Sequence, residues 1–484
     1  MSEKRSIKVN ALLNVIKRIL GVIFPLVTIP YVARVLKSEA YGSVNYGFSV
    51  LSFFLLFSSL GISNYAIREG GRVRNDKAKL NKLANQLFSI NCISMILSYI
   101  VLICFILGFN KLFDIRYLLL CQSLMMLLQA IGTEWINVIF EDYAYITIRY
   151  IIIHIVALIL MFVLVRSPKD YIYYALISIF ASYGGNVLNV FYVRRYVKIK
   201  PTLHLDFKLH IVPILILFVN SIATTVYVNS DVVILEEFVS ESDVGIYSIC
   251  SKIYLIVKEV INAITIVALP RLSAYAGAGN KKEFNKLINN LLKMLLVFIF
   301  PAVIGLMILS KQIILFASGP EYVSGDKSLK VLSVSLAFAV LACLFANGVL
   351  LTQKRDKQYL TGTVSSALLN ILLNFIFIPF WGIIGAAVTT LLSEILMVIV
   401  CSYKHGASIL IKFRYMFSIL LGCLGVAVVC LIVTHTISDY RICLITAVLA
   451  SVIIYFFTLL LLKNETVIEM KESIFSKLKK KKAV

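Results

Sequence analysis

The sequence predicts an all-α integral membrane protein with fourteen transmembrane helices, and three observations support that prediction. First, 60% of the 484 residues are hydrophobic and only 15% are charged, against roughly a quarter charged in soluble domains. Second, apolar stretches of about 20 residues, enough to cross the hydrocarbon core of a bilayer, recur from residue 11 to residue 462. Third, the basic residues are distributed unevenly between alternate loops. A soluble core cannot bury this much apolar surface, whereas a bilayer can.

The first apolar stretch, which begins near residue 11, is expected to be a transmembrane helix. It is too long for the hydrophobic part of a signal peptide, and no small-residue cleavage site follows it. Short loops separate the later stretches, so no extramembrane domain has room to fold. The expected spans cover approximately residues 11–35, 41–66, 83–109, 115–138, 145–165, 171–193, 211–235, 242–268, 286–310, 328–351, 359–379, 382–403, 414–435 and 441–462.

The distribution of charge predicts the orientation of these spans. Cytoplasmic loops of membrane proteins carry an excess of Lys and Arg. If the N-terminus lies in the cytoplasm, 33 of the 47 basic residues, Arg149 among them, fall in cytoplasmic loops and only nine in outward loops. We therefore expect both termini in the cytoplasm. The basic tail, Lys477 to Lys482, then meets anionic lipid headgroups or serves as a signal for orientation. Together with the loops it explains the net charge of +22 without a nucleic-acid partner.

An internal repeat divides the spans into two groups. Gly42 follows span one and Gly245 follows span seven, 203 residues later, and the same offset separates Arg68 from Arg271. Copies offset by six spans have the same orientation in the membrane, as in transporters built from parallel repeats. We expect an N-lobe of residues 1–200 (spans 1–6), a C-lobe of 201–407 (spans 7–12), an appended pair of spans in 408–463, and a basic cytoplasmic tail in 464–484.

Polar side chains follow one face of three of the expected spans. Their spacing of three and four residues places them on a common side of each helix, and ionisable groups within a membrane usually face the protein interior or water. Spans one, seven and eight are therefore expected to line a central water-filled cavity. The polar residues are Asn10, Asn14, Lys17, Gly21 and Thr28 in span one, Asn220, Thr224, Tyr227 and Asp231 in span seven, and Ser248, Lys252, Glu259 and Asn262 in span eight.

The basic residues of these stripes also have a simpler interpretation. Lys17 and Arg18 lie two or three helical turns from the cytoplasmic end of span one, close enough to extend to the headgroups. Lys252 is deeper, and an ion pair with Asp231 or Glu259 would explain it equally well.

The roles of two acidic residues outside the polar stripes, Glu134 and Glu394, are also left open by the sequence. Glu134 is expected near the cytoplasmic surface, beside Glu141 and Asp142. Glu394, in the middle of span twelve, is suited either to carrying protons or to stabilising the helix bundle.

Several functional classes find no support in the sequence. It contains no phosphate-binding Walker motif and no dinucleotide fingerprint, and its five histidines and nine cysteines form no metal-ligand pattern. The outward loops are too short to hold the active site of a polymerase or glycosyltransferase. The sequence therefore predicts a transporter and not an enzyme, without a cofactor or metal.

A set of short motifs resembles the Wzx-type polysaccharide flippases. Their order and spacing extend over most of the chain, while the last two spans are recognisable only by hydropathy. Glu141-Asp142-Tyr143, after Trp135, stands where that family usually has Gly-x-Glu. The motifs are Ala33–Leu36, Glu39–Gly42, Leu60–Ile62, Asp231–Leu235, Val244–Ser248 with Lys252, and Pro270–Ser273.

The resemblance implies the multidrug/oligosaccharidyl-lipid/polysaccharide exporter superfamily and its MATE-like fold of two six-helix lobes around a V-shaped cavity. It implies a bacterial plasma membrane protein that moves undecaprenyl-pyrophosphate-linked oligosaccharides from the inner to the outer leaflet. These units would supply capsule, O-antigen or exopolysaccharide assembly, driven by an ion gradient and alternating access. A glycan polymerase or chain-length regulator is the candidate protein partner, and the transporter is expected to be monomeric.

The polar residues fit that substrate. A diphosphate is strongly anionic and needs cations shielded from bulk water, and the sugar needs hydroxyl, amide and aromatic contacts. The expected substrate-binding residues are Lys17, Arg18, Asn14, Asn220, Thr224, Tyr227, Lys252 and Lys258. The expected ion-coupling or ion-pair residues are Asp231, Glu259 and Glu394.

Two alternatives share the same fold. A cation-coupled multidrug exporter would use acidic cavity residues, and the excess of intramembrane lysine argues against it. A flippase for the lipid-linked precursor of peptidoglycan would use the same basic residues. The sequence leaves the sugar and the coupling ion, H⁺ or Na⁺, open.

Overall fold

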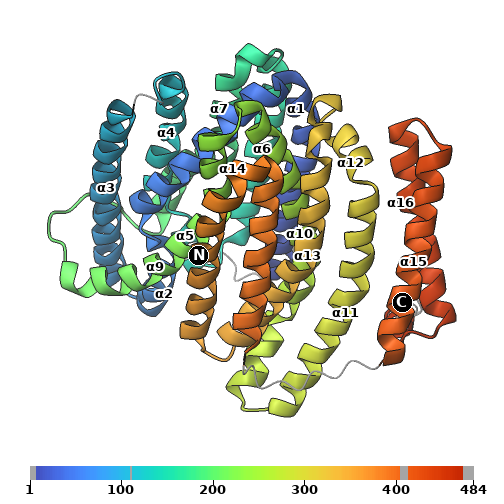
Figure 1. Ribbon diagram of the computed structural model, residues 1–484. Coiled ribbons are helices and arrows are strands. Elements are labelled where there is room, and N and C mark those ends of the chain that lie inside the picture. Colours follow the sequence, from blue (N-terminus) through green and yellow to red (C-terminus); the bar gives the residue numbers. More distant parts are fainter. Residues whose placement is uncertain (1–6, 110–111, 404–412, 473–484) are drawn as a thin grey trace. The chain divides into compact units, whose positions relative to one another are not determined.

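The computed structural model describes residues 7–109, 112–403 and 413–472, and every regular element in these ranges is a helix (Figure 1). Eleven helices of the described residues are long and apolar enough to cross a membrane. Many of their large apolar side chains are exposed, among them Leu97 and Val101, each at 58%. Such exposure is suited to lipid. The predicted class, an all-α multi-pass membrane protein, is confirmed.

Two very long helices each cover two of the expected spans. In α1 (Ile7–Ser59) the helix is interrupted at Lys37, where φ is 66°. In α14 (Asp356–Ser402) it is interrupted at Gly382, where φ is 52°. The break at Lys37 falls between the expected spans 11–35 and 41–66. The break at Gly382 falls on the first residue of the expected span 382–403, which follows the span 359–379. The number of candidate spans depends on how these helices are divided, and the count of fourteen stays a prediction.

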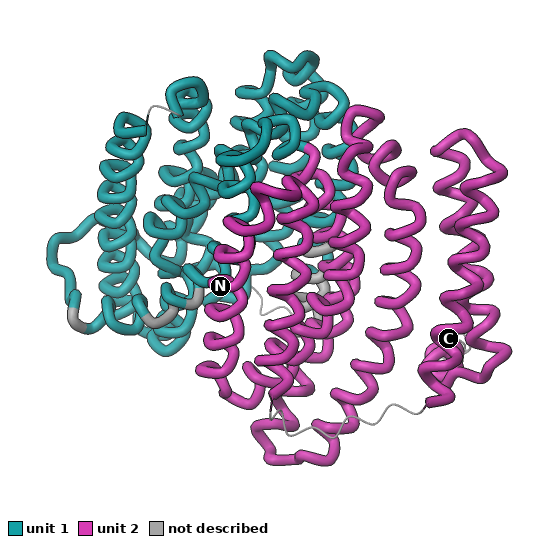
Figure 2. The backbone as a smooth tube through the Cα atoms, viewed as in Figure 1, with its two compact units in different colours: residues 1–245 teal, residues 246–484 magenta. Residues whose placement is uncertain are grey.

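The chain separates into two compact units, residues 1–245 and 246–484 (Figure 2). The predicted division into lobes of residues 1–200 and 201–407 stays a prediction. After α1, unit 1 contains α2 (Ile62–Val73), α3 (Lys77–Gly108), α4 (Arg116–Ala130), α5 (Glu134–Ile139), α6 (Tyr143–Leu164), η2 (Pro168–Asp170), α7 (Tyr171–Ile179), the π-helical turn η3 (Phe180–Gly184), α8 (Gly185–Tyr192), η4 (Val193–Arg195), α9 (Phe207–Phe238) and the first residues of α10 (Glu241–Gly277).

Unit 2 continues α10 and ends in a helical hairpin that corresponds to the two appended spans. Tyr415 donates from its hydroxyl to the Lys293 carbonyl at 2.7 Å, and Tyr455 to the Val297 carbonyl at 2.7 Å. These bonds fasten the hairpin to α11. The elements after α10 are α11 (Lys281–Ile308), α12 (Ser310–Ala317), η5 (Pro320–Gly325), α13 (Asp326–Cys343), the π-helical η6 (Leu344–Leu351), α14, α15 (Phe413–Thr436) and α16 (Tyr440–Leu461).

An apolar core in unit 1 anchors the short helix α5. Trp135, Ile136 and Ile139 are buried in a cluster with residues of α2, α3 and α9. Full burial of one such side chain stabilises a fold by about 1.5–3 kcal/mol. Six residues are too few to form a stable helix alone, so this packing fixes where α5 begins and therefore where Glu134 lies.

The segment between η4 and α9, residues 197–206, lies extended along α3, and we call it the strap. The backbone N–H groups of Lys198, Lys200 and Thr202 donate to side-chain oxygens of α3 at 2.9, 2.8 and 2.8 Å. The acceptors are Asn81, Asn85 and Ser89, one per four residues of helix. Four helical residues rise about 6.0 Å, and two extended residues about 6.6 Å. The two spacings match closely enough for successive hydrogen bonds from Lys198, Lys200 and Thr202 to α3, which we call the ladder.

A buried polar chain fixes the far end of the strap. The Gln86 amide donates to the His204 carbonyl and to Asp206, each at 3.0 Å. Its Oε1 is 2.9 Å from His210 Nε2, whose other ring nitrogen is 2.9 Å from the Tyr65 hydroxyl. The bonds from Gln86, and then Lys82, hold the pKa of Asp206 below its ordinary value, so this carboxylate is charged at neutral pH.

The two repeat-related glycines meet at the start of α10. A Cβ atom on Gly42 would lie 1.9 Å from the Glu241 carbonyl oxygen, and one on Gly245 would lie 2.0 Å from the Ser38 carbonyl oxygen. Ser38 and Glu241 are themselves 203 residues apart, like the glycines. The contact is therefore reciprocal, as in a two-fold interface. The Ser38 and Ser242 hydroxyls, 2.6 Å apart, lie beside it.

We expect Gly42→Ala to destabilise the protein, because its Cβ would overlap backbone atoms that cannot move aside. Overpacking of this kind costs about 1–3 kcal/mol. The thermal unfolding midpoint of purified protein would fall clearly below that of the wild type. Gly71→Ala is the matched control, since a Cβ at that position would have nothing within 4 Å of it. Equal midpoints for the two variants would contradict the close contact.

We expect the double variant Asn81→Ala, Asn85→Ala to speed hydrogen exchange at the amides of Lys198 and Lys200. Each loses a hydrogen bond worth about 1 kcal/mol, which corresponds to roughly fivefold faster exchange. The amide of Thr202, bonded to Ser89, is the internal reference. Unchanged exchange at both lysines would show that the ladder does not hold the strap.

Candidate functional site

A polar cavity of about 290 Å³ lies within unit 1, between the N-terminal part of α1 and residues of α2, α4, α5, α6, η3 and α8. Three of its lining residues are ionisable side chains that contact one another, and most of the others carry amide, hydroxyl or aromatic groups. The lining residues are Lys17, Ser63, Gln129, Gly132, Glu134, Ile146, Arg149, Tyr150, Ile153, Ala181, Ser182, Tyr183, Gly185 and Asn186.

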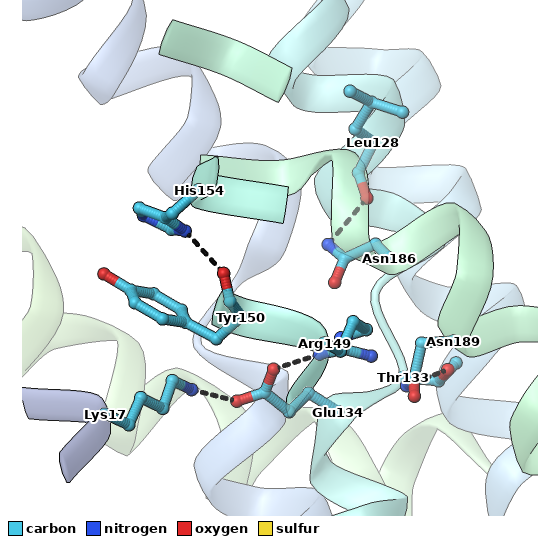
Figure 3. Close-up of polar contacts among 9 residues, drawn as sticks. All are labelled: Lys17, Leu128, Thr133, Glu134, Arg149, Tyr150, His154, Asn186 and Asn189. Carbon is cyan, nitrogen blue, oxygen red and sulfur yellow. Dashed lines mark hydrogen bonds and ion pairs between the residues drawn. The ribbon is translucent and has the colours of Figure 1, made fainter. Parts of the chain in front are cut away.

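Glu134 bridges two cations at the centre of the site (Figure 3). Its Oε1 accepts from Lys17 Nζ at 2.7 Å, and its Oε2 accepts from Arg149 Nη2. Each carboxylate oxygen therefore has its own partner, and the three side chains converge from α1, α5 and α6. Arg149 is 6% exposed, whereas the side chain of Glu134 is 36% exposed. The carboxylate is thus the accessible member of the Glu134–Arg149 pair.

Arg149 is held between neighbouring helices and is almost fully buried. Its Nη1 is buried and has no hydrogen-bond partner among the described residues. A buried guanidinium normally has its donors satisfied. Gly185 makes room for it, because a Cβ there would lie 3.2 Å from Arg149 Nε. The buried Nη1 belongs to a side chain that lines the cavity together with a second cation, Lys17.

Close packing of α6 on α1 places Lys17. Thr147 donates to the Leu13 carbonyl at 3.2 Å, and Gly21 lets the Tyr150 hydroxyl approach to 3.3 Å from where a Cβ would be. Lys17 Nζ lies 5.7 Å from the centre of the Tyr150 ring, a distance at which a cation is attracted to an aromatic face. Gly21, part of the predicted polar stripe, therefore acts by being small.

Amide side chains close the opposite wall of the cavity. Asn186 donates to the Leu128 carbonyl at 2.9 Å, and Asn189 donates to the Thr133 hydroxyl at 3.0 Å (Figure 3). These bonds tie α8 to α4 and to the residue before α5. Gly132 permits the approach, since a Cβ there would meet Asn186 Nδ2 at 2.9 Å.

Among the predicted substrate-binding residues whose side chains the structure describes, only Lys17 lies in this cavity. Lys17 lines it, whereas the side chains of Asn14, Arg18 and Asn220 lie outside the described residues. On α9, Thr224 is exposed, Tyr227 is half-buried and Asp231 is buried. None of these three belongs to this cavity.

A second charged cluster lies in unit 2. Lys258 Nζ is 2.9 Å from Glu394 Oε1, and the Tyr254 hydroxyl donates to the same oxygen at 2.9 Å. Glu394 is 3% exposed and Lys258 is 18% exposed. Two residues that were predicted separately, one to bind substrate and one to couple ions, are thus partners in a buried ion pair.

The other predicted residues of unit 2 lie on α10. Lys252 is half-buried and Glu259 is exposed. An ion pair of Lys252 with Asp231 or Glu259 stays a prediction. So does a single cavity lined by spans one, seven and eight, which would join residues of both units.

Sequence reasoning missed two members of the bridge. Arg149 was counted as a loop charge, but it lies on the second turn of α6 (Tyr143–Leu164) and is buried. Glu134 was placed at the surface beside Glu141 and Asp142, but it contacts Lys17 and Arg149. One signal was available: Arg149 is the single charge in the long apolar run of residues 143–164. A lone charge in such a run usually has a buried partner.

Comparison with known proteins finds two matching families and several relatives named for glycan or polysaccharide biosynthesis and transport. Residues 7–276 match the family described as Polysaccharide biosynthesis protein, and residues 217–376 match the family MatE. A probable low-salt glycan biosynthesis flippase, Agl15 of Haloferax volcanii, is 26% identical over 41% of this chain and 42% of its own length. A putative O-antigen transporter of Shigella dysenteriae is 21% identical over 81% of this chain and 98% of its own. The capsular polysaccharide biosynthesis protein CapF of Staphylococcus aureus is 26% identical over 77% of this chain and 93% of its own length.

Solved structures show the same fold. The lipid II flippase MurJ in an inward closed conformation superposes with a TM-score of 0.72 at 18% identity, over 93% of this chain and 97% of that one. An inward-facing MATE family multidrug transporter of the MOP superfamily superposes with a TM-score of 0.58 at 14% identity, over 82% of this chain and 98% of that one. The predicted MATE-like fold is confirmed. Because the first family match covers more than half of the sequence, the chain belongs to the polysaccharide biosynthesis protein family.

Proposed function

We propose that this protein is a flippase that moves lipid-linked oligosaccharides across the bacterial plasma membrane for surface polysaccharide assembly. The observation that carries the proposal is the convergence of Lys17 and Arg149 in a polar cavity of a multi-pass membrane protein. Relatives named as an O-antigen transporter and a glycan flippase support it. The protein acts as a transporter and not as an enzyme.

The cavity suits the junction between a diphosphate and a sugar. Lys17 offers an ammonium, and Arg149 offers a planar guanidinium, at the wall of the cavity. Charge-assisted hydrogen bonds from such groups to phosphate oxygens are short and strong. Their strength increases where water is largely excluded. Gln129, Ser182 and Asn186 present amide and hydroxyl groups to sugar hydroxyls.

Transport follows alternating access in this proposal, with energy from an ion gradient. Lys252 and Lys258 are the further cations along the substrate path. Asp231, Glu259 and Glu394 are the acidic residues available for the coupling ion. Both termini lie in the cytoplasm, the protein is a monomer, and a glycan polymerase receives the flipped substrate on the outer side.

The multidrug alternative fits the cavity less well. An exporter of organic cations needs net negative charge around its substrate, whereas two cations and one carboxylate line this cavity. A flippase for the lipid-linked precursor of peptidoglycan would need the same cations, because its carrier is also a diphosphate. Substrate competition separates these functions.

Reconstitution tests the proposal directly. Proteoliposomes that contain the purified chain would be loaded with a fluorescent undecaprenyl-diphosphate oligosaccharide, and its movement between leaflets measured with and without a pH or Na⁺ gradient. We expect movement that the gradient accelerates. Transport of the peptidoglycan precursor alone, or export of organic cations without movement of the lipid-linked sugar, would overturn the proposal in favour of the corresponding alternative.

Lys17→Gln is expected to lower the rate of lipid-linked oligosaccharide transport roughly ten- to a hundredfold, because the variant loses one hydrogen bond between charged groups. Lys79→Gln is the matched control, because Lys79 is 72% exposed and pairs with Asp76 at the start of α3. Equal transport by the two variants would remove Lys17 from the site.

Lys252→Ala, with normal membrane insertion, is expected to abolish surface glycan display in cells that depend on this protein. An ionisable side chain within a long apolar helix usually faces the protein interior or a water-filled path, where Lys252 could contact an anionic substrate. Antibody staining of the surface glycan measures the outcome, and wild-type display would exclude Lys252 from the substrate path.

A further inference from the structure

Glu134 occupies the position in which an anionic ligand would sit. One of its oxygens accepts from Lys17 and the other from Arg149. A phosphate group uses its oxygens toward lysine and arginine in the same way. The carboxylate of the protein and the phosphate of a substrate therefore need the same two cations.

The charge balance of the cavity depends on this one residue. Lys17, Arg149 and Glu134 are the lysine, arginine and carboxylate side chains among the residues that line the cavity, and they set its formal charge. With Glu134 in place the cavity carries a net charge of +1, and without its carboxylate the charge would be +2. An empty cavity with two unpaired cations would be costly, because a buried charge that loses its partner strongly destabilises a fold.

The Lys258–Glu394 ion pair in unit 2 provides a comparison, because it is more enclosed than the bridge at Glu134. Glu394 is 3% exposed and is held by Lys258 and by the Tyr254 hydroxyl. Glu134 has no such enclosure, since its side chain is 36% exposed and lines an open volume of about 290 Å³. Arg149 beside it also keeps an unpartnered nitrogen. The Lys258–Glu394 pair is thus enclosed by the protein, whereas the Lys17–Glu134 pair is partly exposed and can be reached by a competing anion.

We propose that Glu134 is an internal counter-ion that holds Lys17 and Arg149 in the empty transporter and is displaced by the diphosphate of the substrate. The inference rests on the proposed function and adds a residue that sets affinity and selectivity. A diphosphate offers several oxygens and more charge than a carboxylate, so it can replace Glu134, whereas weaker anions are rejected. When the substrate leaves, Glu134 pairs with Lys17 and Arg149 again. Its competition lowers the affinity of the site for the diphosphate, so that the substrate can be released.

Glu134→Gln tests the proposal on the full-length purified protein, with inorganic pyrophosphate as the probe. We expect about tenfold tighter binding of pyrophosphate by calorimetry, because one competitor is removed. The thermal unfolding midpoint without ligand should fall, and pyrophosphate should raise it by more than it raises that of the wild type. In proteoliposomes, the variant should flip the lipid-linked oligosaccharide more slowly, since release becomes limiting.

Glu141→Gln is the matched control. It removes the same charge seven residues away, where Glu141 is 51% exposed and pairs with Arg74. Its pyrophosphate affinity should equal that of the wild type. Glu134→Asp provides a second test if the glutamine variant does not fold, because the shorter carboxylate cannot reach both cations and should tighten binding to a smaller extent.

Two results would overturn the inference while leaving the flippase itself in place. One is pyrophosphate binding by Glu134→Gln that is equal to or weaker than that of the wild type, in a folded protein. The other is the absence of any pyrophosphate binding by both proteins, although lipid-linked oligosaccharide is transported. Failure of the proposed function looks different, because the wild type would then move no lipid-linked oligosaccharide at all.

Discussion

A charge inside a bundle of apolar helices must find its partner within the protein, and the described structure is arranged around that requirement. In water, Lys17, Glu134 and Arg149 would each be solvated separately. Within the membrane-embedded fold they meet in one cavity, and their meeting fixes the approach of α1, α5 and α6. Lys258 and Glu394 do the same for α10 and α14 in unit 2. Such pairs contribute little net stability, but they restrict which helices can be neighbours.

Small residues make that approach possible. A Cβ atom on Gly132 would collide with Asn186, and one on Gly21 or Gly185 would crowd Tyr150 or Arg149. Gly42 and Gly245 serve another purpose, because they allow two backbone segments to touch reciprocally. In the bilayer, helices associate mainly through close contact rather than through the exclusion of water. The polar cavity and the backbone crossing thus rely on the same property of glycine.

Much of the fold was predictable from the sequence, because lipid imposes a simple rule on the length and polarity of each helix. Apolar runs of about 20 residues predicted the helices, and the 203-residue offset predicted that Gly42 and Gly245 are equivalent. The site was harder to predict. Lys17 stood out as a lysine within a span, but Arg149 lay near a loop and matched the expected excess of cytoplasmic charge. Its partner Glu134 is 15 residues away in sequence and on another helix. Pairing of this kind depends on tertiary packing, which periodicity does not encode.

The strap also limits how the connection between η4 and α9 can change in length. Its alternate residues are bonded to every fourth residue of α3, so the pairing is fixed in register. Inserting or deleting one residue would turn the bonded N–H groups away from Asn81, Asn85 and Ser89, as a one-residue slip does between two β-strands. A change of two residues would only move the strap along by one step of the ladder. The connection can therefore vary in pairs of residues more readily than one at a time.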